Sequence, residues 1–438
     1  MRFGDSWDAG HPFPPRELVL TRTDMEKYET LADQLVAETL QVNEEFIADR
    51  RFIDPERWKL VKERGTMSAY CMRSRGERRL RRDRLQTEEA VESSYVHRPK
   101  FYSSDSPLDD LICRGYTQQT YDSSQEDSSS LGGSEYYRLD IDTPEQSILE
   151  KMRPPNTPMV VGGGVIPGTV DDAGLGFLAD TEERSIMRAI ASKDLNIKDL
   201  RVLAQIRSPT SQDPFQFLGI KWSSYTSGQG SGMIVKPRDL VVIESTGMTT
   251  DSNGEQVFYF LSHSVEIEEV PEYRKQGLVR INASCCRIVR TYNSQGDIEI
   301  FFRGYSNAGG NYGVAASTQL LCEHLLDSAQ VVEESYMKKL AWFVHSYARR
   351  RKSLEILEDK RGGCACCHKM PTKGFKKFLE STSTCFLCRH KVCKKCTVKK
   401  NLPLDLSSKK SLEFCLTCYL KAKQLSARKV ALATVSKT

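Results

Sequence analysis

Nine of the 14 cysteines in this chain fall within a short C-terminal segment, between Cys364 and Cys418. A gap of two residues lets both sulfur atoms of a Cys-x-x-Cys pair reach one metal ion, and thiolates hold zinc tetrahedrally at about 2.3 Å. Four such pairs predict eight ligands and two zinc ions. The pairs, separated by 17, 4 and 18 residues, are Cys364/Cys367, Cys385/Cys388, Cys393/Cys396 and Cys415/Cys418.

The spacing also predicts how the pairs share the two ions. Four residues between the second and third pairs are too few for these pairs to fold back onto one ion, so we expect a cross-brace. Cys366 is left over. Cysteines without metal are the plain alternative, which the regular spacing disfavours. The expected ligands are Cys364, Cys367, Cys393 and Cys396 for the first zinc, and Cys385, Cys388, Cys415 and Cys418 for the second.

Charge is divided along the chain in the same way as the cysteines. Residues 361–438 hold 18 Lys and Arg against 3 Asp and Glu, whereas the rest of the chain holds 45 against 55. Such a basic segment suits a phosphate-bearing surface, and a solvated basic face is the alternative. We expect no nucleic-acid partner. The predicted membrane or phosphate contacts are Lys373, Lys376, Lys377, Arg389 and Lys391.

The residues before this segment predict a larger α+β domain. A capping box formed by Thr23 and Glu26 would open an amphipathic helix. Alternating strands run from about 200 to 303, and one long helix follows the glycine loop at 309–313. Residues 75–157 are rich in Ser, Asp, Gly and Pro and are expected to form a disordered insertion. A curved sheet around a long helix can enclose a chamber for a small molecule.

This order of elements resembles a START domain. The resemblance rests on the segments 237–244, 257–264 and 58–64. It implies a helix-grip fold over residues 16–350, in which a curved antiparallel sheet cups the C-terminal helix around a lipid-sized cavity. Members of that family bind sterols, phospholipids or sphingolipids without catalysis. The residues that would line the cavity, and the lipid, stay open.

The cysteine segment, 361–422, is similar to a FYVE-type zinc finger, and 423–438 would form a basic tail. Gly374-Phe375 and Ser407–Lys410 add to the resemblance. A START-like domain followed by such a finger is a two-domain family abundant in oomycetes. The family's phosphate-binding Arg and His residues are replaced by Ser381-Thr-Ser-Thr384, and an expected Arg is Glu413. We therefore expect weak, salt-sensitive binding to anionic membranes without preference for one phosphoinositide.

Two other functions use the same residues. A RING-like ubiquitin-ligase module would take His390 as a ligand and leave Cys385 free, although His368 and Leu416-Thr417 depart from the usual RING pattern. A finger that binds a small GTPase or another trafficking protein is the second alternative.

The favoured function is a non-enzymatic, lipid-binding and membrane-associated adaptor. The chain has no run of about 18 apolar residues and no apolar segment in Met1–Pro15, so neither a membrane-spanning helix nor a secretory signal is expected. A cytoplasmic protein, peripheral on endosomal or other anionic membranes, is expected.

Overall fold

The computed structural model describes residues 14–81, 147–192, 197–226, 236–351, 363–369, 382–404 and 409–435. Residues 75–81, the described part of a second compact unit that spans 75–141, are helical. All that follows concerns the first unit, 1–74 with 142–438. Among the described helices, none is both long and apolar enough to cross a membrane.

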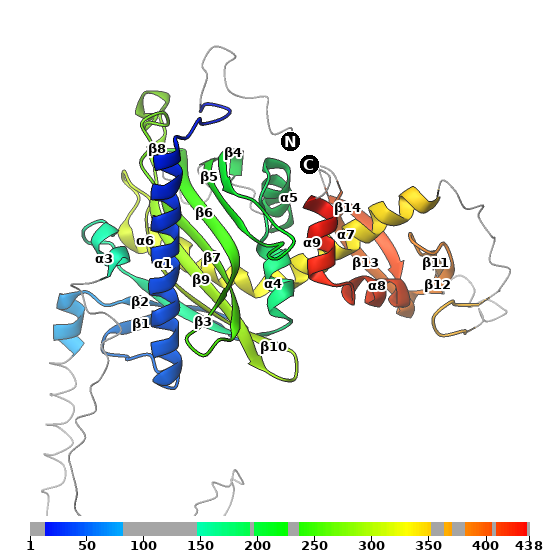
Figure 1. The fold of residues 1–438 in the computed structure, drawn as a ribbon. Helices are drawn as coiled ribbons and strands as arrows, with labels where there is room; N and C mark the ends of the chain where they lie inside the picture. The colour runs from blue at the N-terminus through cyan, green and yellow to red at the C-terminus, as the bar shows by residue number, and fades with distance from the viewer. Residues whose placement is uncertain are drawn as a thin grey trace, which may run out of the picture. The chain divides into compact units, whose positions relative to one another are not determined.

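One large antiparallel sheet dominates this unit (Figure 1). Among the described strands, the short β8 (Val279–Arg280) alone pairs in parallel, with β6, beside the main path of strands. The predicted α+β class is confirmed. In spatial order the other strands are β1 (Trp58–Arg64), β2 (Met67–Met72), β3 (Val160–Pro167), β10 (Asp297–Asn307), β9 (Asn282–Asn293), β7 (Gln256–Ser264), β6 (Arg238–Thr250), β5 (Phe217–Tyr225) and β4 (Ile197–Arg207).

Side chains alternate between the two faces of this sheet, as the period of two in a strand requires. On β9, Arg290 points toward helix α1 (Arg22–Ala48), where its Nε donates to Asn43 Oδ1 at 3.1 Å. Cys285 and Val289 of the same strand lie in the core on the opposite face. That second face is covered by α4 (Val170–Phe177) and by the helices that follow β10.

Helix α1 begins two residues earlier than the sequence suggested. Its N-cap is Thr21, whose side chain accepts from the Asp24 N–H at 3.2 Å, while the Asp24 carboxylate accepts from the Thr21 N–H at 3.1 Å. The capping box predicted at Thr23 and Glu26 is therefore wrong in position. A short acidic side chain at the third helical position completes the box as well as Glu does.

The expected long C-terminal helix is interrupted. Helix α6 (Val314–Leu326) leads into a 3₁₀ turn (Asp327–Gln330), and α7 (Val331–Arg351) continues from there. The predicted insertion is also shorter at its C-terminal end, because α3 (Ile148–Met152) lies inside the range 75–157. Glu38 of α1 fixes this segment by accepting from the Ser147 hydroxyl at 2.6 Å and the Ile148 N–H at 2.7 Å. Residues 82–146 of the insertion lie outside the described residues.

The finger consists of two small hairpins and a helix. Strand β11 (Thr382–Thr384) pairs with β12 (Lys391–Cys393), and β13 (Thr397–Pro403) pairs with β14 (Lys409–Cys415), which leads into α8 (Leu416–Lys423). Its core contains Leu387, Val392, Leu402 and Phe414 together with Leu340 and Val344 of α7. The finger therefore shares a helix with the sheet domain.

The last residues are not only a basic tail, as the sequence suggested. They form α9 (Ala427–Val435), whose Ala427, Val430 and Ala431 belong to the core of the sheet domain. Arg428 of this helix lies 3.2 Å from Asp171 Oδ1 and donates to the Gln212 carbonyl oxygen at 2.6 Å. The apolar side of a basic helix thus returns to the larger domain.

Candidate metal centres and a candidate ligand recess

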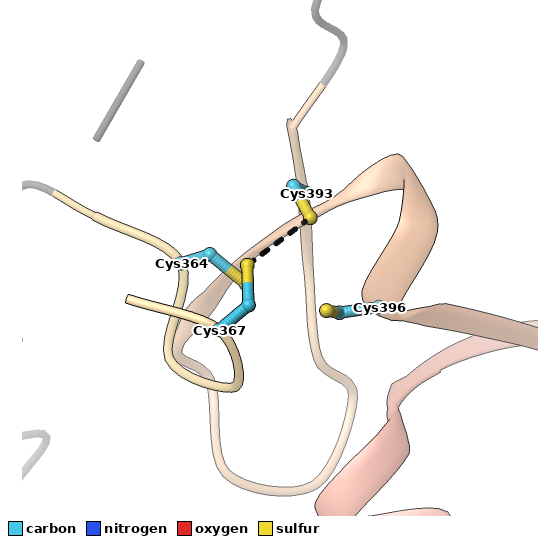
Figure 2. Close-up of side chains that lie close together, drawn as sticks. All are labelled: Cys364, Cys367, Cys393 and Cys396. Carbon is cyan, nitrogen blue, oxygen red and sulfur yellow. Dashed lines mark hydrogen bonds between the residues drawn. The ribbon is translucent and has the colours of Figure 1, made fainter. Parts of the chain in front are cut away.

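The eight paired cysteines come together in two groups of four. The sulfur atoms of each group all lie within 4.8 Å of one another among the described residues. Figure 2 shows the first group, with the four side chains pointing toward a common centre. The grouping is the one that the spacing predicts. The first group is Cys364, Cys367, Cys393 and Cys396, and the second is Cys385, Cys388, Cys415 and Cys418.

Two equivalent turns hold the first pair of each group. The Cys364 carbonyl oxygen accepts from the His368 N–H at 2.8 Å, and the Cys385 carbonyl oxygen accepts from the Arg389 N–H at 3.0 Å. Both residues that follow the pair adopt a left-handed backbone, with φ of 57° at His368 and 63° at Arg389. This geometry turns both thiols of a pair to the same side, although each positive φ is uncommon for a residue other than glycine.

The sulfur spacing fits a tetrahedral metal ion better than a disulfide. Cys367 Sγ lies 3.8 Å from Cys393 Sγ, and Cys388 Sγ lies 3.8 Å from Cys415 Sγ. Four thiolates at about 2.3 Å from one ion lie about 3.8 Å apart, whereas a disulfide brings its sulfurs to about 2.0 Å. All eight cysteines are free thiols in this structure. The donor set therefore fits zinc, and its presence stays a prediction.

The pKa values of the cysteine thiols also suit a site that binds a cation. Burial raises the pKa of the Cys415 thiol to about 12, and the Cys418 N–H donates to its sulfur at 3.3 Å. Desolvation also opposes ionisation of Cys364, but hydrogen bonds from the backbone around Cys367 and Cys393 lower its pKa to about 6. Four crowded thiols cannot all ionise unless a nearby positive charge removes their repulsion.

Two further candidate ligands, Cys366 and His390, lie outside both cysteine groups. Cys366 contacts Thr417, with its sulfur 3.5 Å from the Oγ1 atom. His390 belongs to neither group, and its carbonyl oxygen accepts from the Cys385 N–H at 3.0 Å. The RING-like ligand set, which needs His390 in place of Cys385, is not the set that these side chains form.

The basic residues of the finger are only partly described. Lys373, Lys376, Lys377 and the segment Ser381 to Thr382 lie outside the described side chains, whereas Arg389 and Lys391 are exposed. Glu413 stands opposite Lys399 in the β13–β14 hairpin. Leu416 and Leu420, one helical turn apart on α8, are exposed as well. Further exposed basic side chains are Lys369, Lys394, Lys395, Lys399, Lys410 and Lys421.

Titratable side chains gather on the helix-covered face of the sheet. His324 keeps exposed surface, yet burial among protein atoms lowers its pKa to about 3, with smaller effects from the Arg287 and Arg188 charges. Desolvation also raises the pKa of Glu334 and lowers that of Lys338 to about 7, and both keep partial exposure. We call these five side chains the charged cluster.

Aromatic rings border the charged cluster, since Arg188 and Arg287 lie over Phe177 and Phe260. Phe177 stacks on Phe258 with ring centroids 5.8 Å apart, and its centroid lies 5.1 Å from that of Phe260. These rings come from α4 and β7, so they line the face that α4 covers. The residues that would line a lipid cavity stay open. The sequence signal for the charged cluster is the arginine among inward-facing apolar positions of β9.

No family model and no curated protein matches this chain. Solved structures that match include human STARD10, at 9% identity and a TM-score of 0.33, covering 77% of this chain and 84% of that one. Human StAR-related lipid transfer protein 5 matches at 12% identity and a TM-score of 0.32, covering 67% and 96%. A fragment of a STAR-related lipid transfer protein from Xanthomonas axonopodis matches at 11% and 0.30, covering 63% and 96%.

Proposed function

We propose that this chain is a non-catalytic adaptor in which a finger with two structural zinc ions presents a basic surface to anionic membranes. The observation that supports this most directly is the pair of four-cysteine groups with sulfur separations of 3.8 Å. A zinc ion bound by four thiolates has no open position for a substrate or water, which is the mark of a structural site. The zinc ions would therefore stabilise the finger and take no part in a reaction.

The membrane part of the proposal is supported by the charges of the finger. Each basic residue near an anionic surface contributes about 1 kcal/mol, an attraction that added salt screens over about 8 Å. Leu416 and Leu420 add an exposed apolar pair that a membrane could cover. Because Ser383 bonds to Thr397 Oγ1 at 2.8 Å and offers only a hydroxyl, we expect no phosphoinositide preference.

Sedimentation of the zinc-loaded protein with liposomes tests this part. Binding should appear with phosphatidylserine, phosphatidylinositol 3-phosphate or other phosphoinositides at equal charge density, and salt should abolish it. The double variant Arg389→Glu and Lys391→Glu should weaken binding at least tenfold, at about 1 kcal/mol for each lost charge. Salt-resistant selectivity for phosphatidylinositol 3-phosphate would contradict the proposal. Binding to a small GTPase without any liposome binding would favour the protein-adaptor alternative.

We also propose that the sheet domain binds a lipid or a similar apolar ligand. The support is the charged cluster, which lies beside the Phe177 and Phe260 rings on the helix-covered face of the sheet. Recesses with mostly apolar walls and a few polar groups are the usual form of small-molecule sites. Native mass spectrometry after incubation with a lipid extract should show one bound molecule per chain. Protein that stays free of ligand in every extract would refute this part alone.

A further inference from the structure

Helix α8 carries an apolar pair on the side that faces away from the rest of the finger. Leu416 and Leu420 are 41% and 46% exposed, and among the described residues of the finger they are the only exposed large apolar side chains. They stand four positions apart, so they lie one above the other on one face of the helix. Tyr419 and Ala422, on the other side, pack into the core that the finger shares with α7. Packing of α8 therefore leaves the leucine pair facing outward.

The second cysteine group fixes the helix that carries this pair. Cys415 is the N-cap of α8, and its sulfur accepts from the Cys418 N–H at 3.3 Å. Both residues belong to the second group of four cysteines. A helix of eight residues is too short to be stable in water by itself, so these contacts and the packing against α7 hold it in place. The leucine pair is thus presented on a fixed element.

Basic side chains lie next to the leucine pair. Lys421 follows Leu420 directly and is exposed. At the first turn of α8, Thr417 Oγ1 lies 3.5 Å from Cys366 Sγ, and the N–H of the residue before that cysteine donates to the Lys391 carbonyl oxygen at 3.0 Å. Lys391 is exposed as well. Among the described residues, neither lysine has a carboxylate within 4.0 Å of its ammonium group.

The charge of the finger decides what could cover this face. Residues 361–438 hold 18 Lys and Arg against 3 Asp and Glu. A second copy of the chain on this face would bring like charges together, because a two-fold contact uses the same patch on both copies. An anionic lipid surface supplies the opposite charge and also an apolar layer for the leucines. Charge complementarity therefore favours a membrane over a second copy.

We propose that α8 is the element of the finger that inserts into an anionic membrane, with Leu416 and Leu420 among the upper acyl chains and Lys421 among the headgroups. This rests on the proposed membrane binding and names the side chains that enter the bilayer. Two half-exposed leucines can bury about as much apolar surface as one fully exposed leucine, which raises the affinity about tenfold. A gain of that size does not hold the chain without the basic residues, so salt should still release it.

The test uses the full zinc-loaded chain and vesicles of phosphatidylcholine with phosphatidylserine. The double variant Leu416→Ser and Leu420→Ser should bind about tenfold more weakly than the wild type. It should keep the zinc content and the melting temperature of the wild type, because both side chains are exposed. Leu320→Ser is the matched control, since Leu320 is a 50% exposed leucine of α6 in the sheet domain, and it should bind as the wild type does.

Fluorescence quenching measures the insertion itself. The tryptophan introduced by Leu420→Trp should be quenched by vesicles whose acyl chains carry bromine, beyond the quenching of the wild type. The tryptophan introduced by Leu320→Trp should show no added quenching. This comparison decides the question even if the serine variants are destabilised, because it removes no apolar surface.

The outcomes that overturn the proposal are distinct. Wild-type binding with no added quenching in Leu420→Trp, or with undiminished affinity in the double serine variant, would refute the insertion and leave membrane contact through charge alone. A wild-type dimer in native mass spectrometry that the double serine variant dissociates would assign the leucine pair to a second copy. Wild-type protein that binds no anionic vesicle would refute the proposed membrane binding itself.

Discussion

Removing zinc should loosen the sheet domain as well as the finger. Leu340 and Val344 of α7 are 0% and 6% exposed, and both are buried against finger residues. Because a finger of this kind is unfolded without metal, chelation should expose both side chains. Full burial of a Leu or Val side chain contributes about 1.5–3 kcal/mol, so exposing both costs about 3–6 kcal/mol; we use about 4 kcal/mol, because area-based values overstate burial.

A loss of this size is measurable by thermal unfolding. At about 2 °C per kcal/mol for a domain of this size, a chelator should lower the melting temperature of the sheet domain by about 8 °C. Tryptophan fluorescence reports the transition, since Trp58 and Trp222 are buried in the sheet. The melting temperatures of chelator-treated protein and zinc-loaded protein are compared at equal ionic strength.

Two alanine variants test whether α7 couples the stability of the sheet domain to the finger. Leu340→Ala should destabilise the zinc-loaded protein by about 2–5 kcal/mol but have a much smaller effect after chelation, when its finger contacts are already lost. Leu325→Ala, a fully buried residue of α6 in the sheet-domain core, should cost the same with and without zinc. A melting temperature that chelation does not change, or equal zinc dependence of both variants, would refute the coupling through α7.

Three further predictions concern single sites. Glu244→Leu should cost about 3–5 kcal/mol in urea denaturation, because it leaves Lys221, 2.5 Å from the Glu244 carboxylate, buried without an opposite charge in contact; a double variant with Lys221→Met should recover most of that loss. Cys385→Ser should lose one zinc by metal analysis, whereas Cys366→Ser, outside both groups, should lose none. Burial lowers the pKa of His263 from 6.5 to about 4, so its neutral form stabilises the fold above pH 6.5, and about 3 kcal/mol should be lost as the pH falls to 4. His263→Asn should flatten that acid limb in pH-dependent unfolding, and an unchanged limb would contradict the assignment.

The cysteine groups could be predicted from the sequence because each pair is local. A two-residue gap and a short turn determine where both sulfurs point, with little contribution from the rest of the chain. The gap of four residues between Cys388 and Cys393 was enough to suggest the cross-braced arrangement that the structure forms. The α+β class followed in the same way, from strand alternation and the turn clusters between the strands.

Features that depend on distant contacts could not be predicted. The end of the insertion is ordered because Glu38, more than a hundred residues away, accepts from Ser147 and Ile148. The sequence around α9 is basic, and three small residues such as Val430 make its contact with the core. So short an apolar side could not be recognised among the basic residues.

Zinc content and coordination of the purified full-length protein test the central claim most directly. Native mass spectrometry combined with X-ray absorption at the zinc edge gives both the number of ions and their ligands. We predict two zinc ions per chain, each with four sulfur ligands at about 2.3 Å. One zinc ion per chain, or a nitrogen ligand from His390 in place of the Cys385 sulfur, would contradict the cross-braced finger and favour the RING-like alternative.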